Sequence, residues 1–142
     1  MNEHTDLVRD SFERLSSDME RVSERFFTNV LARDPSLKAI MDRGDPGTSR
    51  TALRSGLGAV IANLDRPLVL ESILFEIGRQ HRQLGMQPGH LGIALDSLLF
   101  AIRDVYPGDW TNELEQAWVE VAAVIMEHMQ RGLRASPVRE TS

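Results

Sequence analysis

Residues 70–84 read LESILFEIGRQHRQL, and apolar residues recur in this stretch at steps of three and four. That spacing places them on one stripe of an α-helix, while charged and amide side chains cover the other faces. The stripe consists of Leu70, Ile73, Leu74, Ile77, His81 and Leu84. His81 stands out, because an imidazole on the apolar face needs partners for its ring nitrogens. A hydrogen bond is the commoner partner, and a bound metal is the other candidate.

The rest of the chain also shows helical periodicity and lacks the strict alternation that is typical of strands. We therefore predict an all-α fold. The helices are expected near residues 5–15, 17–31, 35–40, 49–64, 67–84, 88–106 and 111–133.

Residues with known preferences for helix ends support these boundaries. Ser17 and Glu20 have the spacing of a capping box, and Asp34 stands before a proline that can open a helix. Thr111 is a suitable N-cap residue for the last helix. Gly85 is placed to end the helix of His81 in a left-handed conformation.

The length of 142 residues suits one domain with a substantial core. We expect this domain to cover residues 1–134. Residues 42–48 are rich in glycine, proline and aspartate, which is typical of a loop. Residues 135–142 lack apolar periodicity and are expected to form a flexible tail.

The composition excludes several kinds of function. The net charge is −5 and Lys38 is the only lysine, so no basic surface for nucleic acid is expected. Without cysteine, disulfides, thiolate metal sites and thiol nucleophiles are absent. The polar N-terminus and the lack of a long apolar run predict a cytoplasmic protein with no membrane segment.

His81 has no second histidine or carboxylate three or four residues away on the inward face, which disfavours a zinc or di-iron site. A metal held there must bring most of its own ligands. Haem does so, because the porphyrin supplies four nitrogens and the protein supplies one axial ligand.

Three segments carry a resemblance to a known family. Residues 78–90 contain His81 and, after a short spacer, a Pro-x-His pair; residues 26–37 and residues 115–118 match two further regions in the same order. Together they resemble single-domain bacterial globins and the globin domains of flavohaemoglobins over residues 5–133. The resemblance implies a globin fold packed around a haem pocket.

By this resemblance, His81 is the proximal ligand of haem b (iron protoporphyrin IX), and Leu84 and Met86 touch the porphyrin. The other ring nitrogen of His81 is expected to donate to a carbonyl one turn earlier or to a side chain. Flavohaemoglobins also have a tyrosine and a glutamate that polarise this histidine. Here these positions correspond to Leu91 and to the neighbourhood of Leu133, so we expect a weaker electron donor.

The distal side departs further from the family. Phe27 stands where a tyrosine usually donates a hydrogen bond to the gas, and a phenyl ring cannot donate one. Met41 replaces the phenylalanine that usually stacks on haem, although it is also a plausible core residue. Leu53 is expected to form an apolar wall.

Ser49, Arg50 and Arg54 are the polar candidates at the start of the fourth helix. Arg50 or Arg54 could pair with a haem propionate or act as a distal donor. An equally reasonable alternative is that both arginines lie on a solvated helix face.

The resemblance implies a haem globin that binds O₂, nitric oxide or CO, with nitric oxide detoxification or gas sensing as possible roles. Because the sequence shows no flavin domain, nitric oxide dioxygenase activity requires an external reductase. The alternative is a haem-free globin-fold sensor or protein-interaction module. Either could be a monomer or a homodimer.

Overall fold

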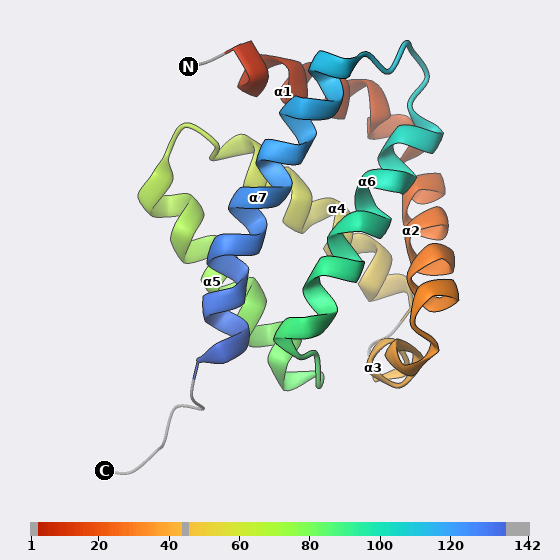
Figure 1. The fold of residues 1–142 in the computed structure, drawn as a ribbon, viewed down its shortest axis with the longest axis vertical. Helices are drawn as coiled ribbons and strands as arrows, with labels where there is room; N and C mark the ends of the chain where they lie inside the picture. Colours follow the sequence, from red (N-terminus) through yellow and green to blue (C-terminus); the bar gives the residue numbers. More distant parts are fainter. Residues whose placement is uncertain (1–2, 44–45, 136–142) are drawn as a thin grey trace.

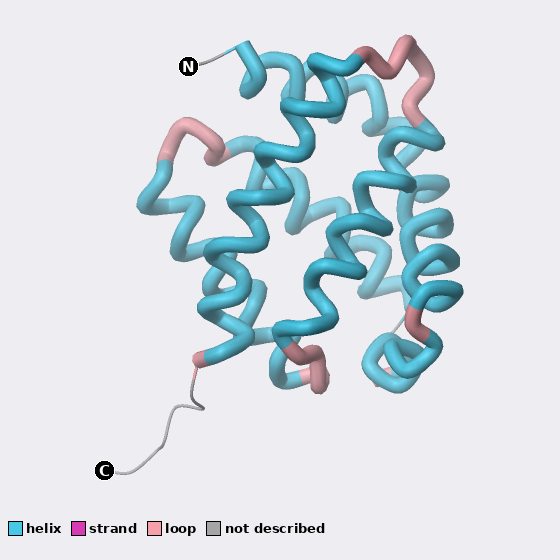
Figure 2. Tube along the Cα trace, in the orientation of Figure 1, coloured by secondary structure: helices cyan, strands magenta, loops and turns pink. Residues whose placement is uncertain are grey.

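The computed structural model describes residues 3–43 and 46–135, and their side chains except those of residues 46–50. Figures 1 and 2 show helices joined by short connections, and the described residues contain no strand. The α-helices are α1 (Glu3–Leu15), α2 (Met19–Arg33), α3 (Lys38–Asp42), α4 (Pro46–Ala62), α5 (Pro67–Gln83), α6 (Leu91–Val105) and α7 (Asn112–Arg134). The predicted all-α fold with seven helices is thus confirmed.

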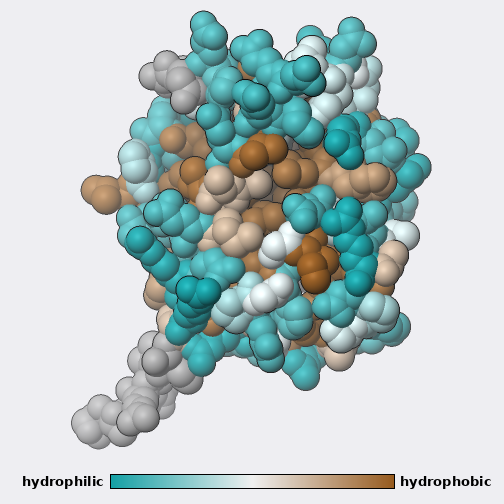
Figure 3. Space-filling view, viewed as in Figure 1, coloured by the Kyte–Doolittle hydropathy of each residue, from teal (hydrophilic) through white to brown (hydrophobic). Residues whose placement is uncertain are grey.

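Two helix pairs form the frame of the molecule. α5 packs mainly against α7, and α2 packs mainly against α6, while α4 crosses behind them in Figure 1 and touches α2 and α5. Their apolar faces meet in one buried cluster, which includes Leu57, Leu74 and Trp118. Figure 3 shows further apolar side chains along the line between α6 and α7, surrounded by hydrophilic ones. The helix of His81 therefore lies between α4 and α7.

Some helix starts differ from the prediction. Ser17 lies in a 3₁₀ turn (Ser16–Asp18), and α2 begins at Met19 without a side-chain cap, so the predicted capping box is wrong. α4 begins at Pro46, although residues 42–48 were expected to be loop. The third and sixth helices begin with 3₁₀ turns, at Pro35–Leu37 and Pro88–His90, before α3 and α6. In both cases proline begins a 3₁₀ turn, the tighter helix form that is frequent at helix N-termini.

Other helix-end predictions are confirmed. The Asp34 side chain accepts from the Ser36 backbone amide at 3.1 Å, and the Thr111 hydroxyl accepts from the Leu114 amide at 3.1 Å. The Ser36 hydroxyl also donates to Asp34 and lowers the pKa of this carboxyl. Asp34 therefore stays ionised as a cap.

α5 and α7 approach each other at a pair of glycines. A Cβ atom on Gly132 would lie 2.1 Å from the Phe75 carbonyl oxygen, and one on Gly78 would lie 2.3 Å from the Met129 carbonyl oxygen. Only residues without a side chain fit at such distances. Gly78 precedes His81 by less than one helical turn, so this contact sets the position of the helix that carries the imidazole.

A buried hydrogen bond ties α1 to α7. The Trp118 indole N–H donates to the Ser11 hydroxyl at 2.9 Å, and that hydroxyl donates to the Val8 carbonyl at 3.0 Å. Since both side chains are buried, the indole has no water to replace this partner.

We expect Ser11→Ala to lower the free energy of unfolding by about 1–3 kcal/mol, because it leaves the Trp118 N–H unpaired. Ser97→Ala is the matched control, since Ser97 is equally buried but its hydroxyl has no partner among the described residues. Urea unfolding of both variants measures the difference. Equal losses in the two variants would contradict the role given to the hydrogen bond.

Within the described ranges, no helix has the length and apolar character needed to cross a lipid bilayer. The predicted tail at residues 135–142 lies outside the described residues, apart from Ala135.

Candidate functional site

His81 lies in the last turn of α5 and is half-buried. Its Nδ1 donates to the backbone carbonyl of Ile77 at 2.8 Å, one turn earlier, as expected. This bond assigns the ring hydrogen to Nδ1 and leaves the lone pair on Nε2. No hydrogen-bond partner for Nε2 is found among the described residues. Nε2 is therefore the atom with which His81 can bind a metal.

Backbone hydrogen bonds and a left-handed glycine stabilise the C-terminal end of α5, just after His81. Gly85 has a φ of 101°, which only glycine adopts without strain. The Gly85 amide donates to the Arg82 carbonyl at 2.9 Å, and the Met86 amide donates to the His81 carbonyl at 3.0 Å. This pair of bonds is a Schellman motif, and it confirms the predicted left-handed helix end.

Arg43 also holds this helix end, and the sequence did not reveal it. Its Nη1 donates to the Leu84 carbonyl at 2.6 Å. A Cβ atom on Gly85 would lie 2.2 Å from that same nitrogen, so Gly85 also makes room for the guanidinium. The contact joins residues 41 positions apart, and no local pattern signals such a pairing.

The three apolar residues expected on the distal side lie on three different helices, α2, α3 and α4. Leu53 is half-buried against the core cluster, and Phe27 and Met41 are half-buried as well. The Phe27 ring makes an edge contact with Phe26, with 4.9 Å between the ring centroids. A Cβ atom on Gly56 would lie 3.8 Å from the Ile77 side chain, so α4 approaches α5 one turn before His81.

The polar distal candidates are Ser49, Arg50 and Arg54, at the start of α4. Arg54 is exposed, in line with the solvated alternative. The side chains of Ser49 and Arg50 lie outside the described part of the chain.

On the proximal side, Met86 is buried and Leu84 is half-buried. Leu91, expected at the position of the tyrosine, and Leu133, near the expected position of the glutamate, are both buried apolar residues. The partner that the structure gives to His81 Nδ1 is thus a neutral carbonyl and not a carboxylate.

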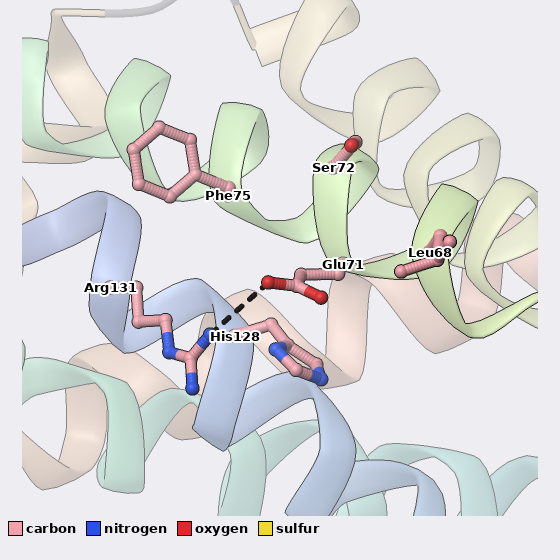
Figure 4. Close-up of a pocket in the computed structure, with 6 residues that line it drawn as sticks. All are labelled: Leu68, Glu71, Ser72, Phe75, His128 and Arg131. Atoms are coloured by element: carbon pink, nitrogen blue, oxygen red, sulfur yellow. Dashed lines mark hydrogen bonds and ion pairs between the residues drawn. The ribbon is translucent and has the colours of Figure 1, made fainter.

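The other histidines have separate roles. His90 accepts a hydrogen bond from the Gln87 amide at 3.0 Å and so stabilises the turn before α6. His128 is half-buried on α7 and lines a hollow between α5 and α7 (Figure 4). In the described residues, no three histidine or acidic side chains cluster as metal ligands.

The family model described as Globin matches residues 24–129. The chain belongs to the globin family. This globin is 29% identical over 128 residues to a flavohemoprotein of Bacillus subtilis (strain 168), a match that covers 89% of this chain and 32% of the relative. The chain thus spans about a third of the length of the flavohemoproteins that it matches.

Two further similarities concern proteins of about the same length. This globin is 25% identical over 139 residues to neuroglobin of Danio rerio, covering 89% of this chain and 87% of the relative. A crystal structure of a hexacoordinated haem protein from an anhydrobiotic tardigrade at pH 4 matches with a TM-score of 0.85. That match covers 95% of this chain and 96% of the other at 17% identity, so it shows the shared fold alone.

Proposed function

We propose that this globin binds haem b through Nε2 of His81 and takes a diatomic gas on the opposite side of the iron. The observation that supports this best is the hydrogen bond from His81 Nδ1 to the Ile77 carbonyl. It holds the ring in the tautomer that a metal requires and orients it from a rigid helix end.

The surrounding residues fit an apolar macrocycle with a single protein ligand. Met86 and Leu84 follow His81 and would contact the proximal face, while Phe27, Met41 and Leu53 would line the distal face. The bound iron would supply reversible gas coordination, which no side chain of this protein can provide. The chain's own contribution is to hold the imidazole and to exclude water.

The neutral partner of Nδ1 points to gas binding over peroxidase-like chemistry. A carboxylate partner would give the imidazole more anionic character, whereas the Ile77 carbonyl polarises it less. We therefore favour reversible binding of O₂, nitric oxide or CO. Nitric oxide dioxygenation is a further possibility with an external reductase, and gas sensing is another possible use of the same site.

An absorption spectrum of the purified protein with added haem tests the proposal. We expect a Soret band that shifts on reduction with dithionite and again on addition of CO. His81→Ala should lose or strongly alter this spectrum, because it removes the axial nitrogen. His128→Ala is the matched control, since it removes a half-buried imidazole from α7 and should leave the spectrum unchanged.

Two outcomes would contradict the proposal. If the folded wild-type protein takes up no haem, the haem-free sensor or interaction module becomes the better hypothesis. If His81→Ala keeps the wild-type ferrous and CO spectra, the haem is bound by another residue.

A further inference from the structure

One hydrogen bond joins the segment of α3 to the end of α5, across two sides of the proposed haem pocket. Met41 of α3 would line the distal face, whereas Leu84 follows His81 and would contact the proximal face. Arg43 comes two residues after Met41, and its Nη1 donates to the Leu84 carbonyl at 2.6 Å. In Figure 1, α3 and the turn after α5 both lie at the lower end of the molecule. A single side chain thus connects the two walls.

The α3 segment lies close to the turn after α5 at a second point. A Cβ atom on Gly85 would lie 2.2 Å from Arg43 Nη1 and 3.7 Å from the Ile40 side chain. Ile40 in turn packs against the core cluster, which anchors α3 from the inside. The bare backbone of Gly85 therefore makes room for the guanidinium on a segment that is already held in place.

The Leu84 carbonyl is a favourable acceptor for a cation. The last carbonyls of a helix lack donors from their own helix and form the negative end of its dipole. Among the turn bonds of the described residues, no backbone amide is bonded to this carbonyl. A charged donor makes a stronger hydrogen bond than a neutral one, so Arg43 supplies what the end of α5 lacks.

We propose that the bond between Arg43 and the Leu84 carbonyl is a strap that closes one edge of the haem pocket and slows the passage of haem in both directions. The proposal rests on the proposed function, since it treats the two segments as opposite walls of one haem site. Because the bond joins the walls directly, it must break before a macrocycle passes between them at this edge. The strap is closed in this structure.

Rates of haem uptake and haem loss test the strap. Stopped-flow mixing of the haem-free chain with CO-haem gives the uptake rate, and transfer of haem to a haem-free acceptor globin gives the loss rate. Arg43→Met keeps an unbranched side chain and removes every donor. We expect it to raise both rates by about 5- to 10-fold, the effect of losing one charge-assisted hydrogen bond at the surface.

Arg33→Met is the matched control. Arg33 is an exposed arginine in the last turn of α2, and its carboxylate partner Asp96 lies 4.0 Å away. The control makes the same substitution outside the strap, so it should leave both rates unchanged.

Haem with esterified propionates separates a strap from a direct contact with haem. An arginine that binds a propionate slows haem loss only, and it has no carboxylate to bind in the dimethyl ester of haem. A strap acts between the walls of the protein, whatever the charge of the macrocycle. Arg43→Met should therefore raise uptake and loss of the dimethyl ester by the same factors as for native haem.

Four results would overturn the strap. They are a faster loss of native haem alone, which would make Arg43 a propionate ligand; unchanged rates in Arg43→Met; equal changes in Arg33→Met; and a weaker helical circular dichroism signal of haem-free Arg43→Met, which would mean that its helices are loosened throughout. A wild-type protein that takes up no haem would contradict the proposed function itself, and the strap with it.

Discussion

Replacing Gly132 by alanine is expected to lower the free energy of unfolding by roughly 3 kcal/mol. The added methyl group would lie 2.1 Å from the Phe75 carbonyl oxygen and 2.8 Å from the Arg79 amide nitrogen. Both atoms belong to the backbone of α5, so no side chain can turn away to make room. The two helices must separate, and the packing along their whole contact is weakened.

Urea or thermal unfolding measures this effect, and Gly92→Ala in α6 is its control. A Cβ atom on Gly92 meets only the end of the Met126 side chain, at 3.9 Å. Gly92→Ala should therefore be neutral or slightly stabilising, because alanine is the better helix former. If the two variants were equally stable, the close approach of α5 and α7 would not be the constraint described above.

The second large effect concerns Phe27 and rests on the proposed gas site. Phe27→Tyr should slow O₂ release by about 10- to 100-fold, because the added hydroxyl can donate a hydrogen bond to a ligand that gains negative charge, an interaction worth about 1.5–3 kcal/mol. CO gains little charge, so its release should change much less. Stopped-flow measurement of both gases on the same variant provides the comparison.

The result would contradict a distal place for Phe27 if the O₂ and CO release rates changed by the same factor, or if neither changed. An equal change would mean that the variant alters access to the pocket. Unchanged rates would mean that the side chain at position 27 does not reach the gas.

How far the sequence predicts the structure depends on the range of each interaction. Thr111 and Gly85 were correctly assigned as helix ends, because each acts on backbone groups within a few residues. Ser17 was not, because the turn at residues 16–18 leaves α2 to begin at Met19. The periodic stripe on α5 identified its helix and the unusual position of His81 for the same local reason.

The interactions at the candidate site also separate into local ones and long-range ones. The bond from His81 to the Ile77 carbonyl joins residues four apart on one helix, and such a carbonyl was one of the two partners expected for this nitrogen, the other being a side chain. The bond from Arg43 to the Leu84 carbonyl and the contact of Gly132 with α5 join distant parts of the chain. No periodicity or motif reports how two such segments meet.

The sequence by itself determined the all-α fold, the helix that carries His81 and the apolar face on which the imidazole stands. These properties follow from side-chain spacing and from backbone hydrogen bonds within one or two helical turns. Only the tertiary structure decided that glycines bring α5 and α7 together, that Arg43 holds the end of α5, and that Leu68, Val69 and Phe75 of α5 are exposed in the folded chain. Those features depend on how whole helices pack, and packing is set by the combined shape of many side chains that lie far apart in the sequence.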